Sequence, residues 1–133
     1  MLATLVLAGL LLAHGLIHLG FIAPRPAATA GRPEWPFELS RSWLLTGFGV
    51  PMAVAERFGR GLVTGSVVGF AVAAVVVLGL VPGAAWPATI AFGSVASLGL
   101  LAIFFHPWLV LGIVIDLAAL FAVVIAGWRP VVG

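Results

Sequence analysis

The residues of this chain that could do chemistry are two closely spaced histidines and one distant acid. His14 and His18 lie four residues apart in an apolar stretch, and Asp116 is the only formally charged residue inside any long apolar stretch. Residues four apart share one face of a helix. A charged side chain at the centre of a membrane costs about 2.5–3.5 kcal/mol, so it normally faces protein or water and has a partner. We therefore expect His14, His18 and Asp116 to form one polar site.

Depth along the helix axis supports this grouping. At a rise of about 1.5 Å per residue, His14 lies about 13 Å and His18 about 7 Å from the end of their segment at Ala23. By the same rise, Asp116 lies about 12 Å from the start of its own segment at Trp108. These two segment ends are expected on the same side of the membrane. His14 and Asp116 are therefore level.

A divalent metal ion is one chemistry that this set could support. Neutral imidazole and carboxylate are ligands for zinc, copper and non-haem iron. His106 lies just before Pro107, at the turn on the same side of the membrane. The candidate ligands are His14, His18, Asp116 and His106, with a water as the alternative fourth ligand. Haem fits less well, because two axial histidines approach the iron from opposite sides whereas His14 and His18 share a face.

Two other interpretations stay open. A histidine beside a buried carboxylate is suited to passing protons, so the same groups could form a proton relay or a pocket for a polar ligand. In a purely structural role, Asp116 and His14 would satisfy each other and His18 would extend toward the membrane interface. The small residues Gly9, Ala13 and Gly20 lie about 100–180° around the helix from the histidines, so the two surfaces cannot both face one neighbour.

Nucleophilic catalysis is not expected. The chain has no cysteine and no lysine. Ser94 and Ser97 are expected to pack between helices and bond to the backbone, because no histidine–acid pair is expected beside them at their depth.

The elements that must position these residues are four long apolar segments. Of the 133 residues, 63% are hydrophobic and 8% are charged, and the mean hydropathy is +1.29, which excludes a water-soluble globular domain. The segments cover residues 2–23, 62–81, 84–105 and 108–127, and each has about the 20 residues that a membrane-spanning helix requires. We expect an all-α, polytopic membrane protein: a single membrane domain made of a bundle of four transmembrane helices.

Charge predicts the orientation of this bundle. Five of the six basic residues lie in the loop 24–61, namely Arg25, Arg32, Arg41, Arg57 and Arg60. Arginine-rich loops stay in the cytoplasm, so both termini are expected outside the cell membrane. The basic charge then reflects topology and attraction to anionic lipid, and nucleic-acid binding is not expected.

The loop itself has two parts. After a proline-rich connector, residues 42–55 are apolar but too short for a span, which predicts a surface-lying or re-entrant segment. Pro51 can open a helix that continues through Glu56 and Arg60 into the second span. Residues 28–30 (ATA) match a signal-peptide cleavage site, but the first segment lacks a cationic start and is longer than a signal-peptide core, so we expect a retained span.

Small residues predict where the helices pack closely. In membranes, Gly, Ala and Ser let helix backbones approach one another. The expected packing positions are Gly61, Gly65, Gly69 and Ala73 in the second span, Thr89, Gly93 and Ser97 in the third, and Gly112 and Ala119 in the fourth.

Two stretches of the chain carry a resemblance. Residues 13–21 (AHGLIHLGF) and 105–112 (FHPWLVLG), followed by Ile115, Asp116 and Leu117, resemble segments of uncharacterised small four-helix integral membrane proteins from high-GC bacteria. The resemblance spans most of the chain. It implies a four-helix membrane fold and attaches no activity.

The function expected from the sequence is that of a small integral membrane protein. Its His/Asp site would lie in the cytoplasmic half of the bundle and handle a proton, a metal ion or a polar ligand. The alternative is an accessory or structural subunit that docks on a larger membrane complex, or on a second copy, through its small-residue faces.

Overall fold

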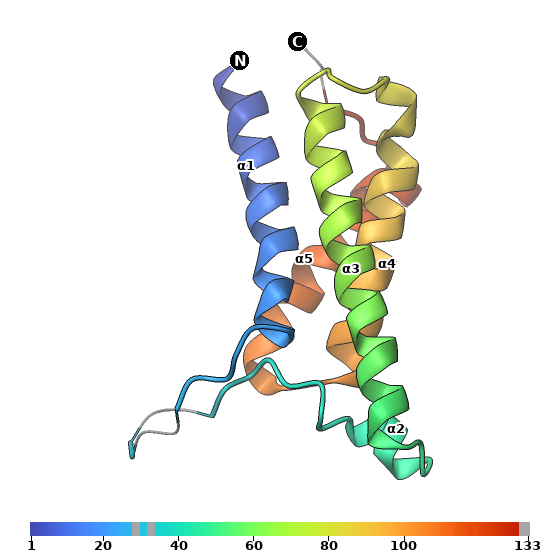
Figure 1. Ribbon diagram of the computed structural model, residues 1–133. Coiled ribbons are helices and arrows are strands. Elements are labelled where there is room, and N and C mark those ends of the chain that lie inside the picture. Colours follow the sequence, from blue (N-terminus) through green and yellow to red (C-terminus); the bar gives the residue numbers. More distant parts are fainter. Residues whose placement is uncertain (28–29, 32–33, 131–133) are drawn as a thin grey trace.

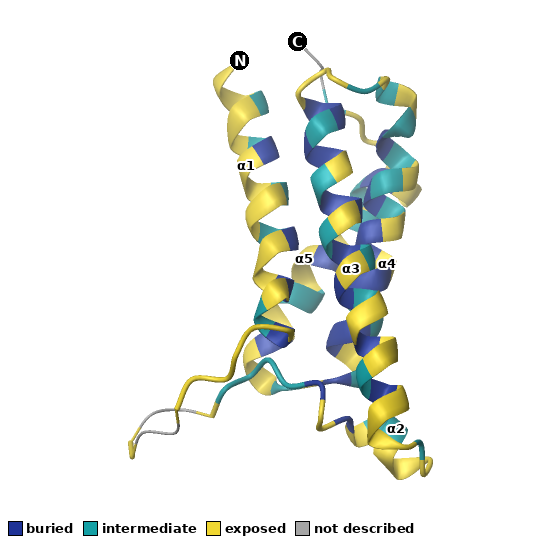
Figure 2. Ribbon diagram, viewed as in Figure 1, coloured by how far each residue is buried: buried dark blue, intermediate teal, exposed yellow. Residues whose placement is uncertain are grey.

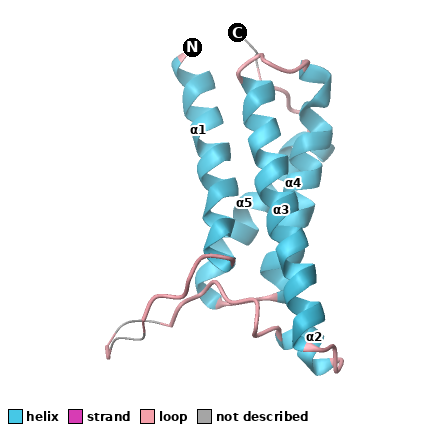
Figure 3. Cartoon of the chain, viewed as in Figure 1, coloured by secondary structure: helices cyan, strands magenta, loops and turns pink. Residues whose placement is uncertain are grey.

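The computed structural model describes residues 1–27, 30–31 and 34–130, and all regular structure within these ranges is helical (Figure 3). The predicted cleavage motif falls on Ala28 and Thr29, which lie outside the described residues, as does Arg32. Four helical segments are long and apolar enough to cross a membrane: Leu2–Phe21, Met52–Val77, Gly83–Ile103 and Pro107–Ile125. The all-helical fold and its four long apolar helices are confirmed.

Most of these segments change helix type near an end. The first is α1 (Leu2–Ile17) continued by the 3₁₀ turn η1 (His18–Phe21), and the second is α3 (Met52–Val77) alone. The third is η2 (Gly83–Ala85) followed by α4 (Trp86–Ile103). The fourth is η3 (Pro107–Leu109), α5 (Val110–Leu120) and a π-helical turn, η4 (Phe121–Ile125). A short helix, α2 (Trp43–Gly47), precedes α3.

Helices α3 and α4 form the centre of the bundle. They lie side by side, with α1 on one flank and α5 behind (Figure 1). In the most apolar stretch of α3 and of α4, 44% of the residues are buried, against 17% in α1 and in the α5 segment. The outer surfaces of α1 and α5 are accordingly exposed and apolar, as Figure 2 shows for α1.

Small residues bring α3 and α4 into backbone contact. A Cβ atom added at Gly69 would lie 2.5 Å from the Cα atom of Gly93, and one added at Gly65 would lie 3.1 Å from the Cβ of Ala96. Ala73 is fully buried. On α5, a Cβ at Gly112 would lie 2.9 Å from Leu101, and Ala119 packs against the buried core. Gly61 differs from the prediction, because it is exposed with nothing within 4 Å of an added Cβ.

The helix predicted to open at Pro51 and to continue into the second span is confirmed, and it ends at Val77, before the predicted limit of residue 81. Pro51 precedes the first turn of α3, and the helix then runs unbroken through Glu56 and Arg60, whose side chains lie 4.0 Å apart. Residues 42–55 are therefore divided between α2 and the start of α3, with Gly49 in a positive-φ conformation between them. They do not form one continuous surface segment.

The end of the loop closes one end of the bundle. Ser42 caps α2 by accepting a hydrogen bond from the backbone of Leu45, and its hydroxyl donates to the carbonyl of Ile103. Trp43 Nε1 donates to the carbonyl of Ala102. These bonds satisfy carbonyls at the C-terminal end of α4 that would otherwise lack partners.

The buried apolar residues form two clusters, one toward each end of the bundle. One includes Ala8, Phe70, Ile90 and Val123, and the other includes Phe21, Val63, Leu100 and Leu109. On each long helix, the residues between these positions include a polar side chain: His14 and His18, Ser66, Ser94 and Ser97, and Asp116. A polar layer therefore lies between two apolar ones.

Candidate functional site

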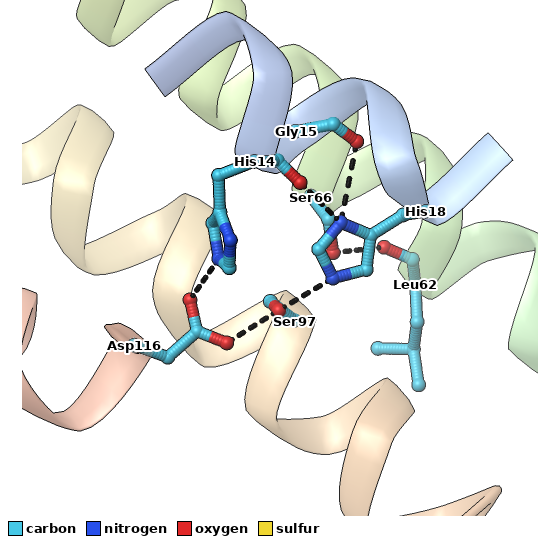
Figure 4. A network of polar contacts seen from close by, with 7 residues as sticks. All are labelled: His14, Gly15, His18, Leu62, Ser66, Ser97 and Asp116. Atoms are coloured by element: carbon cyan, nitrogen blue, oxygen red, sulfur yellow. Dashed lines mark hydrogen bonds and ion pairs between the residues drawn. The ribbon is translucent and has the colours of Figure 1, made fainter. Parts of the chain in front are cut away.

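His14 and Asp116 are in direct contact. His14 Nε2 lies 2.9 Å from Asp116 Oδ1, joining α1 to α5, and the Asp116 side chain is fully buried (Figure 4). The structure thus pairs the two residues that the depth count placed level. A neutral His14 that carries its proton on Nε2 donates to the carboxylate, which gives the buried charge a partner.

Ser97 connects this pair to the second histidine. Its hydroxyl lies 2.5 Å from Asp116 Oδ2 and 2.7 Å from His18 Nε2, so one serine of α4 bridges α5 and α1 (Figure 4). The expectation that Ser97 has no histidine–acid pair at its depth is wrong. Ser97 is fully buried, and the sequence predicts it as a packing position and not as a member of the polar site.

His18 is held in one orientation by the backbone. Its Nδ1 donates to the carbonyl oxygens of His14, at 2.8 Å, and of Gly15, at 3.2 Å. A carbonyl oxygen can only accept, so Nδ1 must carry a proton. His18 is 2% exposed, so it does not extend to the interface as the structural interpretation predicted.

Gly15 determines how close α1 comes to α3. A Cβ atom added at Gly15 would lie 2.9 Å from Phe70 Cβ, and the His14 ring packs edge-on against the Phe70 ring at 4.7 Å. The glycine lets α1 approach, and the two histidines that flank it then reach inward. The exposed small residues Gly9 and Ala13 lie on the other side of α1, as their angular separation predicted. Gly20, the third residue of the predicted small face, lies in η1 and is partly covered by the Phe37 ring.

The hydrogen bonds of the network require one exchangeable proton. The Ser97 hydroxyl has a single hydrogen but contacts both His18 Nε2 and Asp116 Oδ2, so a second hydrogen must come from one of these groups. Either a cationic His18 donates to Ser97, which donates to the carboxylate, or a protonated Asp116 donates to Ser97, which donates to a neutral His18. Both arrangements pair every donor and, with His14 neutral, have no net charge.

The predicted metal ligands are not gathered in one place. Among the described residues, no group of three or more histidine or acidic side chains is arranged to hold a metal ion. Ser97 separates His18 from Asp116, and His106 Nδ1 instead accepts a hydrogen bond from the backbone of Trp108, capping η3. The metal set His14, His18, Asp116 and His106 therefore has no geometric support.

Two cavities flank the His14–Asp116 pair. One, of about 150 Å³, is lined by both histidines and by η3 and α5 residues that precede Asp116. The other, of about 260 Å³, is lined by His14, by α1 residues that precede it, and by residues that follow Asp116 in α5 and beyond. Helices α1 and α5 run in opposite directions (Figure 1). The cavities therefore lie on opposite sides of the pair along the bundle. Their walls are largely apolar, which does not suit the polar ligand considered above.

A second buried serine makes a contrast with Ser97. Ser94 lies one turn earlier on α4 and is also fully buried, but its hydroxyl has no hydrogen-bond partner among the described residues. The two serines thus share a helix and a degree of burial, and only Ser97 belongs to the network.

Comparisons with known proteins add no assignment: no family model, curated protein or solved structure matches the chain.

Proposed function

We propose that this chain is a four-span protein of the cell membrane that transfers a proton through the network His14–Asp116–Ser97–His18. The observation that carries the proposal is the position of the Ser97 hydroxyl between His18 and Asp116. If Nε2 of His18 gives its proton to Ser97 while Ser97 gives its own to Asp116, one proton moves from imidazole to carboxylate. No atom other than hydrogen has to move far.

Burial favours such a transfer over a permanent ion pair. Separated charges are costly in a low-dielectric interior, and moving the proton neutralises both. Histidine and aspartate inside membrane helices commonly line proton pathways. His14 also lines both flanking cavities, so it supports a path that enters from either side of the pair.

The proposed orientation of the bundle in the membrane follows from the positions of the arginines. The loop that carries Arg25 and Arg41, and the first turns of α3 that carry Arg57 and Arg60, lie at the opposite end of the bundle from the N-terminus (Figure 1). With this loop in the cytoplasm, the 150 Å³ cavity lies on the cytoplasmic side of the pair and the 260 Å³ cavity on the outer side.

Proton flux into liposomes tests the proposal. Wild-type protein, reconstituted with a pH-sensitive dye inside and driven by a potassium diffusion potential, should carry protons faster than protein-free liposomes. Ser97→Ala removes the bridging hydroxyl and should reduce the flux to the protein-free rate. Ser94→Ala removes a buried hydroxyl from the same helix without touching the network, and should keep the wild-type flux. Equal flux in wild type and Ser97→Ala would sink the proposal, as would no flux from the wild type.

One observation supports the accessory role as a second candidate. Gly9 and Ala13 form an exposed small-residue surface on α1, and an added Cβ at Gly9 meets nothing within 4 Å. Such a surface suits close approach by a helix of another chain or of a second copy. Under this proposal, Gly9→Leu should release a stoichiometric partner, or convert a dimer to a monomer, in size-exclusion chromatography of the solubilised protein. An unchanged elution volume would argue against it.

A further inference from the structure

The larger cavity has the features of a binding site for a small lipid-soluble molecule. Its volume is about 260 Å³, whereas an apolar cavity of about 150 Å³ is enough to bind benzene. Leu11, Phe70, Ile90 and Val123 contribute apolar walls. The cavity therefore has room for an aromatic ring with substituents.

The lining contains one side chain suited to recognising a polar atom. Among the described residues that line the cavity, only His14, Trp86 and Trp128 have polar side-chain atoms. Trp86 Nε1 already donates to the Trp128 carbonyl. His14 uses Nε2 for Asp116, and its Nδ1 has no hydrogen-bond partner within the described ranges. In a neutral imidazole that donates from Nε2, Nδ1 is an acceptor, so it would pair with a hydroxyl group.

The rim of the cavity opens onto the apolar surface of the bundle. Leu10, Ile115 and Trp128 line it and are 62%, 42% and 45% exposed. They lie on α1, on α5 and just beyond η4, the segments with the most exposed apolar surface. A molecule dissolved in lipid would enter between these segments without crossing water.

We infer that this cavity binds a neutral aromatic compound that carries a ring hydroxyl, such as a phenol or a quinol, with the hydroxyl donating to His14. The inference concerns binding alone and goes beyond the proposed proton transfer, on which it does not depend. Apolar walls exclude a charged ligand, because burying an unpaired charge is costly. The indole N–H groups of Trp86 and Trp128 can only donate, so His14 Nδ1 is the one side-chain acceptor among the described lining residues, and it selects a hydroxyl donor.

Tryptophan fluorescence provides the assay. Trp86 is buried in the cavity wall, so a brominated ligand bound there should quench its emission. The probes are 4-bromophenol and 4-bromoanisole, which differ in that the second has no hydroxyl hydrogen to donate. Both are titrated into wild-type protein in lipid nanodiscs, with concentrations expressed per lipid. We expect saturable quenching by 4-bromophenol and about tenfold weaker binding of 4-bromoanisole, the loss typical of one hydrogen bond.

Three variants assign the binding to this cavity. His14→Phe keeps a ring but removes the acceptor, so both probes should bind equally weakly. Ala122→Leu fills the cavity without changing the polar network, and should abolish saturable quenching. This variant tests the site independently if His14→Phe does not fold. Ser97→Ala should bind 4-bromophenol like the wild type, which separates this inference from the proton proposal. Three results would each overturn the inference. They are quenching that rises linearly with probe concentration, equal affinities of the wild type for the two probes, and unchanged binding in Ala122→Leu.

Discussion

Asp116 is the residue on which the polar layer most depends, because its two oxygens join three helices. Oδ1 contacts His14 of α1, and Oδ2 accepts from Ser97 of α4, which in turn contacts His18. Removing the carboxylate leaves His14 Nε2 without its partner and leaves the Ser97 hydroxyl with His18 alone. The cost of that loss falls on the folded state, since both groups are hydrated when the chain unfolds.

Replacement of Asp116 by leucine should therefore destabilise the bundle strongly. Leaving a buried hydrogen-bonding group without its partner costs about 1–3 kcal/mol. The free energy of unfolding in mixed micelles, measured by denaturant titration with circular dichroism, should fall by this amount. Ser94→Ala is the matched control and should leave stability unchanged or raise it, because the Ser94 hydroxyl is buried without a partner within the described chain. A Leu variant as stable as wild type would contradict the assigned network.

The sequence could predict part of this site and not the rest. Depth alone placed His14 beside Asp116, because helical rise is nearly constant. The same count from Phe105 puts Ser97 about 12 Å deep, level with both, so the information that would have found it was present. The expectation that no histidine–acid pair lies at the depth of Ser97 is therefore contradicted by the rise itself, whereas Ser66 has the backbone bond expected of serine in a membrane helix, to Leu62. The hydrogen bond between His18 and Ser97 depends on how α1 and α4 are rotated about their axes, and residue spacing alone does not predict that rotation.

At the scale of helices, the contact between α3 and α4 depends on glycines that face each other. A Cβ at Gly69 would meet the backbone of Gly93 at 2.5 Å, and a backbone cannot rotate aside as a side chain can. Gly61, two turns earlier on α3, faces open space.

Alanine substitutions at these two glycines should have opposite effects. Gly69→Ala should destabilise by about 1–3 kcal/mol, the usual cost of overpacking. Gly61→Ala should be neutral, or stabilising by up to about 1 kcal/mol, because alanine is the better helix former. Thermal unfolding of both variants in the same detergent gives the comparison. Similar losses at both positions would mean that helix propensity or lipid contact, rather than the α3–α4 approach, sets the effect.

Sequence patterns predicted the helices better than their limits. Apolarity located four segments and placed the start of the second at residue 62, whereas α3 begins at Met52, where Pro51 predicted the helix to open. The four-residue repeat identified Gly65, Gly69 and Ala73 as packing positions. It failed at Gly61, which faces open space although its neighbours Gly59 and Leu62 lie close to the end of α4. A sequence repeat predicts which face of a helix carries small residues. How much of that face is in contact depends on the path of the helix packed against it.

For the molecule as a whole, the proposed orientation can be tested directly because the chain contains no cysteine. Ser40 lies in the arginine-rich loop and Ala84 in the turn before α4, and both are exposed. In intact cells, a membrane-impermeant maleimide should label Ala84→Cys and leave Ser40→Cys unlabelled until the cells are lysed. The reversed pattern would place the loop outside, and the assignment of the two cavities to the two membrane faces would reverse with it.

The backbone contact of α3 with α4 has a mechanical consequence for the network. Ser97 belongs to this close-packed pair, whereas His18 and Asp116 belong to the outer segments, which bury far less of their surface. Ser97 thus belongs to the better buried helix pair, and each of its two hydrogen bonds depends on the position of one less buried segment. Since hydrogen bonds weaken steeply beyond about 3.2 Å, a shift of about 1 Å in either segment breaks the connection. The path from His18 through Ser97 to Asp116 is therefore continuous only when the first and the fourth segments both pack against α4.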